Sequence, residues 1–158
     1  MVVDLRDVWK AFDDKPVLQG LSLTLEKGTT LAVMGGSGSG KTVLLRTIDG
    51  LIAPDDGEVW LLGTRIDGLR EEQLLPVRRR AGYVFQGAAL FDSLSVFENV
   101  AFPLREHTRL GEGEITDRVH RSHALVGLPD TDDLLPGALS GGMRKRVGIA
   151  RAIVGEPE

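Results

Sequence analysis

The chain has 158 residues, of which 42% are hydrophobic and 27% are charged, and its formal net charge is −4. This is enough apolar material for one globular domain with a core of its own, and the acidic balance argues against a broad electrostatic surface for nucleic acid. There is no cysteine, which excludes disulfides and thiolate metal sites. No apolar run approaches the ~20 residues that span a bilayer, and the first residues do not form a signal peptide. We therefore expect a soluble, cytoplasmic protein.

Apolar and polar residues alternate at the start of the chain, as they do in half-buried strands. This pattern predicts strands over residues 2–8 and 21–25. The short apolar run Thr29–Met34 predicts a buried strand, which leads into a glycine-rich stretch. Residues 41–48 then have helical spacing, so the order here is strand, glycine loop and helix.

The mixed pattern continues to residue 86. Residues 58–62 and 81–85 are predicted strands, and Gln86 follows the second of them directly. Between them, residues 71–80 are predicted to be helical despite Pro76.

Beyond Gln86 the chain changes character. No strand is evident from about residue 87 to residue 136, and apolar spacing over 96–104 and 115–126 predicts a helical insertion. His120 and His123 share a face of the second helix in this pattern. We interpret them as a solvated pair rather than as a metal site, because His107, His120 and His123 lack a convincing metal spacing.

Eight consecutive residues match the phosphate-binding pattern G-x-x-x-x-G-K-[ST]. They are Gly35, Gly36, Ser37, Gly38, Ser39, Gly40, Lys41 and Thr42. Small residues let successive backbone N–H groups point at phosphate oxygens, and the following helix aims its positive end at them. Lys41 would reach the β- and γ-phosphates, and the Thr42 hydroxyl would bind Mg²⁺. An accidental match has odds on the order of one per cent, so we interpret this stretch as a P-loop that binds nucleotide.

A second motif lies near the end of the sequence. It comprises Leu139, Ser140, Gly141, Gly142 and Met143. Ser140 is a good N-cap for the basic amphipathic helix that is predicted to run to about Val154. Taken alone, this stretch is only an N-cap and a turn. After a P-loop and a helical insertion, however, it resembles the signature sequence of the ATPase subunits of ABC transporters.

The resemblance covers essentially the whole chain and implies the α/β fold of a P-loop NTPase of ABC type. Such a protein has a RecA-like core, an antiparallel β subdomain and a helical subdomain. On this basis residues 1–158 form a single, incomplete nucleotide-binding domain. Residues 1–86 are the β subdomain and P-loop core, residues 87–138 the helical subdomain, and residues 139–158 the signature helix.

The resemblance also implies roles for residues outside the P-loop. Phe12 lies where such proteins place the aromatic residue that stacks on adenine; the alternative is a core phenylalanine, and Trp9 is a second candidate for stacking. Gln86 resembles the Q-loop glutamine, which helps to hold Mg²⁺ and the attacking water and contacts the membrane partner. The alternative for Gln86 is an ordinary residue at the end of a strand.

The signature would complete the nucleotide site of a second copy of the chain. Ser140, Gly141 and Gly142 would contact the γ-phosphate of ATP held by the other subunit, because a second helix N-terminus adds positive potential there. ATP would thus join a homodimer head to tail. Met143 departs from the family's usual glutamine and cannot donate a hydrogen bond, but the serine and the glycines remain.

The Gly-Gly-Met sequence and the segment Phe85–Thr108 resemble the Mla/Mce-associated ATPases, which power the movement of phospholipids or other lipids between bacterial membranes. The resemblance implies an integral-membrane permease as partner, no nucleic acid, and a location on the cytoplasmic face of the inner membrane through that permease alone. Four apolar side chains of the segment are candidates for the permease contact, although we expect at least two of them to fill the helical core. They are Phe91, Val96, Phe97 and Phe102.

Family members continue with an apolar strand ending in Asp-Glu, which supports Mg²⁺ and polarises the attacking water. This sequence stops where that strand should begin, and neither Glu156 nor Glu158 follows an apolar strand. Three alternatives therefore stay open beside a lipid-transport ATPase. They are an ABC ATPase for another substrate, a non-catalytic truncated module, and a soluble ABC protein acting on DNA or ribosomes.

We expect this polypeptide to bind nucleotide weakly and to hydrolyse it poorly, because loss of general-base assistance costs roughly 10²–10⁴ in rate. A steady-state ATPase assay on the purified chain measures this. Turnover in the usual enzyme range of roughly 1–10³ per second, abolished by Lys41→Ala, would contradict the expectation.

Overall fold

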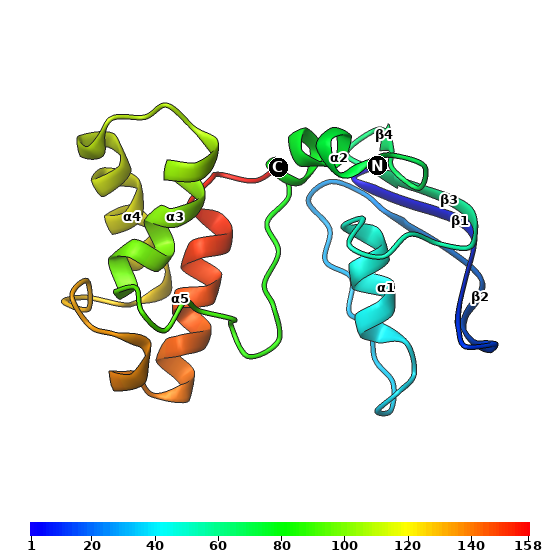
Figure 1. Ribbon diagram of the computed structural model, residues 1–158, viewed down its shortest axis with the longest axis horizontal. Helices are drawn as coiled ribbons and strands as arrows, with labels where there is room; N and C mark the ends of the chain where they lie inside the picture. The colour runs from blue at the N-terminus through cyan, green and yellow to red at the C-terminus, as the bar shows by residue number, and fades with distance from the viewer. The chain divides into compact units, whose positions relative to one another are not determined.

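The computed structural model describes residues 1–158, and these form two compact units, residues 1–78 and 79–158. The first unit combines an antiparallel sheet with two helices, and the second is helical (Figure 1). No helix in the structure is both long and apolar enough to cross a membrane.

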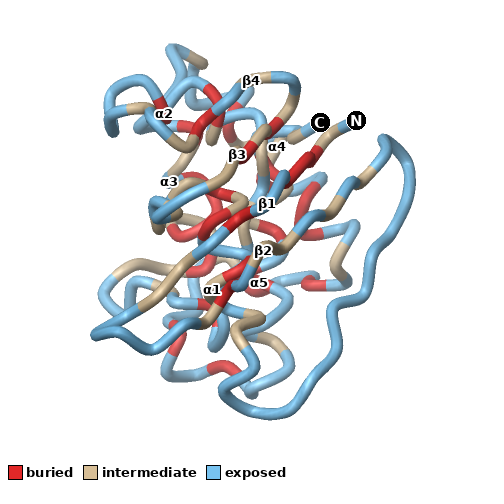
Figure 2. The backbone as a smooth tube through the Cα atoms, turned by 90° about the vertical axis from the view of Figure 1, so that its right-hand side faces the viewer, coloured by how far each residue is buried: buried red, intermediate tan, exposed pale blue.

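The sheet of the first unit has the strand order β2-β1-β3-β4. Its strands are β1 (Val3–Phe12), β2 (Lys15–Leu25), β3 (Asp56–Leu61) and β4 (Thr64–Arg65). The hairpin between β1 and β2 turns at Asp13 and Asp14, whose φ angles of 48° and 60° are those of the tight turns that suit twisted hairpins. Strand β1 runs further toward its C-terminal end than predicted, and β2 begins earlier, because bulges interrupt the alternation of buried and exposed positions (Figure 2) on which the prediction rests.

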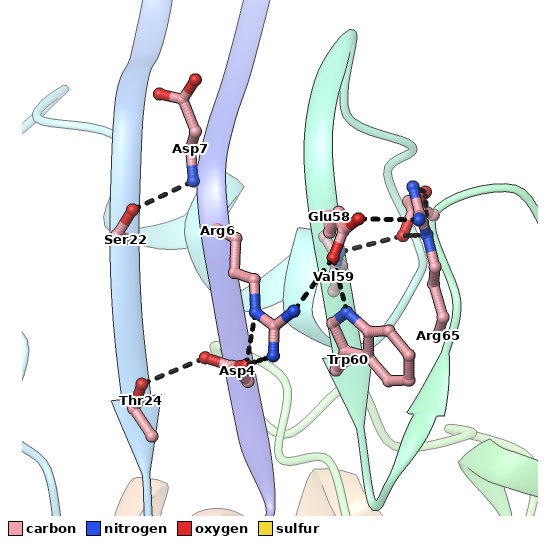
Figure 3. Close-up of polar contacts among 10 residues, drawn as sticks. Asp4, Arg6, Asp7, Ser22, Thr24, Glu58, Val59, Trp60 and Arg65 are labelled. Carbon is pink, nitrogen blue, oxygen red and sulfur yellow. Dashed lines mark hydrogen bonds and ion pairs between the residues drawn. The ribbon is translucent and has the colours of Figure 1, made fainter.

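One face of this sheet carries the unit's core and the other carries a ladder of charges. Buried Leu5, Val8 and Val59 lie on the first face, each at most 1% exposed. On the other face the Arg6 guanidinium contacts both Asp4 on its own strand and Glu58 on β3 (Figure 3). Two further hydrogen bonds extend this ladder to the outer strands β2 and β4. Thr24 Oγ1 donates to Asp4 Oδ1 at 3.0 Å, and Arg65 Nη1 donates to Glu58 Oε1 at 2.8 Å.

Both predicted helices of the first unit are confirmed. Helix α1 (Lys41–Ile48) occupies the predicted range and buries Leu44 and Thr47. Helix α2 (Glu71–Arg78) tolerates Pro76 and buries Leu74 and Val77.

The second unit packs three helices around one apolar cluster. They are α3 (Val96–His107), α4 (Glu112–Val126) and α5 (Gly141–Ile153), with the short 3-10 helix η1 (Pro136–Ala138) before the last. The cluster takes residues from all three helices, and its most buried members include Val100, Val119 and Val147, each 0% exposed. Helix α3 begins with a reciprocal capping box between Ser95 and Glu98. The predicted helices are therefore confirmed, with α3 and α4 slightly longer than expected.

Two predicted strands are wrong. Residues 29–34 and 81–85 are not strands, and Leu31, Val33 and Met34 are 46%, 40% and 89% exposed rather than buried. An apolar run becomes a buried strand only where a neighbouring strand takes its backbone hydrogen bonds. The single sheet of the structure contains β1–β4 alone, so neither run has such a neighbour.

Gly57 is required by the close approach of β1 and β3. Between Arg6 and Trp9 the register of β1 against β3 shifts, and Gly57 lies opposite this irregularity with φ of 92°. A Cβ atom at Gly57 would lie 2.3 Å from the backbone oxygen of Asp7. Gly63 also has a positive φ, 79°, but a Cβ there meets no atom within 4 Å.

We expect Gly57→Ala to lower the free energy of unfolding by at least about 3 kcal/mol, because backbone atoms must move. Gly63→Ala is the matched control, and its cost should be only the roughly 1–2 kcal/mol of a left-handed alanine. Urea unfolding of the two variants measures both values. Equal losses would show that the contact between the strands does not constrain Gly57.

Candidate nucleotide-binding site

The P-loop wraps around the ammonium group of its own lysine. Lys41 Nζ donates to the backbone oxygens of Gly35 and Gly36 at 2.8 and 2.6 Å, and to Ser39 Oγ at 3.3 Å. Since Lys41 is also the first residue of α1, its charge lies at the positive end of that helix. The loop thus places a cation next to a helix N-terminus, an arrangement that favours binding of an anion.

The glycines of the loop meet distinct geometric demands. A Cβ at Gly35 would lie 2.7 Å from Ser39 Oγ, so a side chain there would fill the inside of the loop. Gly40 is the N-cap of α1 with φ of 89°, and a Cβ there would lie 3.1 Å from Val17 Cγ1. No side chain caps this helix, so its first-turn N–H groups have no side-chain acceptor. Thr42, on the first turn, is exposed.

Phe12 lies in the same unit as the P-loop and is not a core residue. It is the last residue of β1 and is 43% exposed, and Lys10 Nζ lies 5.4 Å from the centre of its ring. Trp9 is equally exposed, but its Nε1 is engaged with Asp7 Oδ1 at 3.2 Å. Exposure therefore does not separate the two rings, and Lys10 lies over one face of Phe12.

Gln86 lies in the second unit, in a turn rather than at the end of a strand. The Ala88 N–H donates to the Phe85 oxygen at 3.0 Å, which closes a four-residue turn with Gln86 and Gly87 at its centre. Gly87 has φ of 79°, as the third residue of a type II turn requires. The Gln86 side chain is exposed at this tip.

The signature residues form the N-terminus of α5 in the second unit. Ser140 is the N-cap, and its Oγ accepts a hydrogen bond from the Met143 N–H at 3.2 Å. Ser140, Gly141 and Gly142 are exposed, whereas Leu139 is 4% exposed and anchors the motif. Met143 packs against the apolar cluster of the unit, which explains why an apolar side chain is accepted at this position.

The prediction of a solvated histidine pair is wrong for one of its members. His123 is only 4% exposed, and its Nδ1 lies 2.9 Å from Asp132 Oδ1. His120 contacts the other oxygen of the same carboxylate at 2.8 Å. Asp132 lies in the loop after α4, so the helical periodicity of the two histidines could not predict that it contacts them.

One charged pair behind the P-loop helix was not predicted. Asp49 is the C-cap of α1 and is 8% exposed. Arg78 of α2 donates to the backbone oxygens of Asp49 and Gly50 at 2.9 and 2.7 Å. Burial raises the pKa of the Asp49 carboxyl to about 6, and the positive charge of Arg78 offsets part of that rise. No sequence pattern links these positions, because 29 residues separate Asp49 from Arg78.

The family model for ABC transporters matches residues 18–158, a range that includes the P-loop, Gln86 and the signature. The chain belongs to the ABC transporter family. The expected fold class is thereby confirmed as that of an ABC ATPase, here with a mixed α/β composition and an antiparallel sheet.

Curated ABC proteins align with nearly the full chain. The MlaF ATP-binding protein of an intermembrane phospholipid transport system in Escherichia coli K12 is 44% identical over 157 residues, covering 99% of this chain and 58% of MlaF. The methionine import ATP-binding protein MetN of Rhizobium johnstonii is 44% identical over 156 residues, covering 99% of this chain and 43% of MetN. The chain thus spans about half the length of these relatives.

A solved ABC cassette has the same fold. The dimeric cassette MJ0796, in a post-hydrolysis state with ADP and Pi, is 32% identical and superposes with a TM-score of 0.91. The match covers 98% of this chain and 70% of that cassette.

The pKa of Asp49 predicts how stability depends on pH. Its folded-state value of about 6 lies above the ordinary value of 3.8, so the folded state binds this proton more tightly than the unfolded state does. The tighter binding of this proton stabilises the folded state fully below pH ~4, and this stabilisation is lost as the pH rises through about 6. Asp49→Asn should therefore raise stability at pH 7.5 by roughly 1–3 kcal/mol and have little effect at pH 4.

Thermal unfolding at the two pH values measures this difference. Asp55→Asn is the control with opposite sign, because hydrogen bonds from Lys10 and the Ala11 N–H lower the pKa of Asp55. Its ionised form stabilises the fold, so Asp55→Asn should lower the melting temperature at pH 7.5. A melting temperature of Asp49→Asn below that of the wild type at pH 7.5 would refute the assignment.

Proposed function

We propose that this chain is the nucleotide-binding part of an ATPase subunit that binds MgATP and drives lipid transport through a membrane permease. The observation that carries the proposal is the P-loop geometry, in which Lys41 Nζ lies within 2.6–3.3 Å of three loop oxygens at the N-terminus of α1. Membership of the ABC transporter family gives that geometry its context.

ATP would be bound by groups that the structure already presents. The Lys41 ammonium exchanges loop oxygens for β- and γ-phosphate oxygens, while N–H groups of residues 35–42 point at the phosphates. The exposed ring of Phe12 would stack on adenine. Ser37, Gly38 and the other loop residues have no bulk that would keep phosphate away.

The residues around the loop also suit Mg²⁺. Gly35 keeps the inside of the loop clear, and the Thr42 hydroxyl is exposed beside Lys41 on the first turn of α1. Thr42 and Gln86 would hold the ion through oxygen atoms, which is the ligand type that Mg²⁺ prefers. Bound Mg²⁺ would neutralise charge that develops on the phosphates. Gln86 would also orient the attacking water.

A second copy of the chain would complete the site. Ser140, Gly141 and Gly142 form an exposed helix N-terminus that suits the γ-phosphate of ATP held by the partner copy. The dimeric state of the related cassette MJ0796 supports a homodimer, for which we propose the head-to-tail arrangement. We further propose that residues 87–138 act as the helical subdomain and residues 139–158 as the signature helix of each copy.

The helical insertion offers a surface for a permease. The rings of Phe91 and Phe102 lie 4.8 Å apart and are 44% and 38% exposed, whereas Val96 is fully buried and Phe97 packs against the core. The aromatic pair is therefore the better candidate for the contact. Such binding would hold the protein on the cytoplasmic face of the inner membrane.

A lipid is the proposed cargo, supported by MlaF and by the resemblance of Phe85–Thr108 and Met143 to lipid-transport ATPases. MetN is equally identical, so an importer of another small molecule is the second candidate.

The test uses the full-length gene product co-expressed with its permease. Lys41→Ala should abolish nucleotide binding and ATP hydrolysis. Ser140→Arg should keep nucleotide binding to the P-loop but lose ATP-driven dimerisation and hydrolysis, because the bulky cation blocks the contact with the partner's nucleotide. Retention of dimerisation and turnover by Ser140→Arg would contradict the proposed role of the signature.

The cargo is tested on the same complex reconstituted in vesicles that contain fluorescent phospholipid. ATP-dependent movement of the phospholipid, absent in Lys41→Ala, supports lipid transport. ATP hydrolysis that is stimulated by methionine or another solute, with no movement of phospholipid, would favour the second candidate.

A further inference from the structure

The three residues after Gln86 all have left-handed backbone conformations. The φ angles are 79° at Gly87, 69° at Ala88 and 46° at Ala89. A non-glycine residue in this region costs about 1–2 kcal/mol, so two alanines in succession need external support. Such strain at a functional loop persists only where the surrounding structure holds it.

Arg151 of α5 provides that support. Its Nη2 donates to the Ala88 oxygen at 2.6 Å and its Nη1 donates to the Ala89 oxygen at 2.9 Å. The guanidinium carbon also lies 6.0 Å from the centre of the Phe91 ring. Hydrogen bonds from a charged donor are about twice as strong as neutral ones, and the two together fix the orientation of both peptide groups.

Gly148, three residues before Arg151 on the same helix, allows the loop to approach. A Cβ at Gly148 would lie 2.9 Å from Ala88 Cβ and 3.2 Å from Ala88 Cα. Glycine in a helix interior costs about 1 kcal/mol relative to alanine, and this contact accounts for its presence in α5. Ala88 is accordingly only 2% exposed.

Helix α3 holds the other end of the same loop. Asn99, which is 0% exposed, accepts a hydrogen bond from the Phe91 N–H at 2.8 Å and donates to the oxygens of Phe91 and Leu94 at 3.1 and 3.0 Å. The loop is thus bound at Ala88 and Ala89 by α5 and at Phe91 by α3. Gln86 lies just before this double attachment, in the turn closed by the Ala88 N–H.

We propose that Arg151 is a positioning residue that sets the place of Gln86. The missing side chain at Gly148 lets the loop come close enough to α5 for these hydrogen bonds. This inference rests on the role of Gln86 in the proposed function. Helix α5 carries the signature at its first turn and Arg151 in its last turn. A displacement of α5 when the signature contacts nucleotide would therefore move the turn that carries Gln86, so one helix links the two motifs.

The test compares two arginines of α5 in the full-length protein with its permease. Arg151→Met removes the donors to the loop after Gln86. Arg146→Met is the matched control, because Arg146 Nη1 also donates to two backbone oxygens, those of Gly127 at 2.6 Å and Val126 at 3.4 Å, but at the end of α4. Both variants lose two hydrogen bonds to carbonyl groups, but only Arg151→Met loses them in the loop that follows Gln86.

In Arg151→Met we expect kcat for ATP to fall about 10- to 100-fold, since misplacement of a positioning group has effects of this size. The KM for ATP should stay within about twofold, because the P-loop contacts are unchanged. Arg151→Lys, which keeps one donor, should recover part of the loss. Arg146→Met should retain the wild-type kcat. Hydrogen exchange of the amides in residues 86–91 should accelerate in Arg151→Met and not in Arg146→Met.

Gly148→Ala provides a second route that does not remove any hydrogen bond. It raises the helix propensity of α5 but pushes Ala88 away from the helix, so kcat should fall although Arg151 keeps both donors. Adding Ala88→Gly removes the atom at 2.9 Å and should restore part of the activity. This pair decides the matter if Arg151→Met does not fold.

Unchanged kcat in Arg151→Met, or an equal loss in Arg146→Met, would overturn the proposal, as would unchanged exchange over residues 86–91. The exchange measurement needs no turnover. A wild-type protein without ATP hydrolysis would therefore count against the proposed function, while the attachment of the loop to α5 would still be tested.

Discussion

Backbone carbonyl groups at helix ends and in left-handed turns lack partners within their own segment, and in this protein long cationic side chains supply the donors. Lys41 binds oxygens of the P-loop, and Arg78 binds those at the end of α1. Arg146 and Arg151 do the same at the end of α4 and in the loop after Gln86. Each cation satisfies two or more acceptors at once, so each fixes the direction of a chain reversal as well as its hydrogen bonding.

Each of the two units supports a different part of the proposed nucleotide site. In the first, the antiparallel sheet places Phe12 at the end of β1, while Arg78 anchors the far end of the helix that follows the P-loop. In the second, the cluster between α3, α4 and α5 supports both the signature and the turn at Gln86. Most residues expected to touch nucleotide are exposed, while Gly40 and Lys41 are partly buried. The residues that hold them are buried or bridge between elements. Substitution at a supporting residue can therefore affect chemistry without any contact with ATP.

The helices could be predicted from the sequence because the signals are local, although α4 begins at Glu112 rather than at the predicted residue 115. The glycine-lysine pair begins α1, and Ser140 begins α5 with its side chain bound to the Met143 N–H. The runs 29–34 and 81–85 were predicted as strands and are not, because strand formation depends on a neighbour that an apolar run cannot specify. The partners of His123 and Arg151 were also missed, since Asp132 and Ala88 are brought to them only by the fold. The role of each P-loop residue remains a prediction based on spacing.

The three oxygens around Lys41 bear on the energetics of nucleotide recognition. A free lysine side chain has roughly 2 kcal/mol of rotamer entropy, and in this loop folding already orders it in place. Phosphate oxygens must then compete with the oxygens of Gly35, Gly36 and Ser39 for the same ammonium. Binding is therefore an exchange of acceptors around a preorganised cation. The enthalpy of nucleotide binding therefore reflects the difference between carbonyl and phosphate oxygens as partners of the ammonium. A neutral ligand of similar shape gains nothing from the exchange.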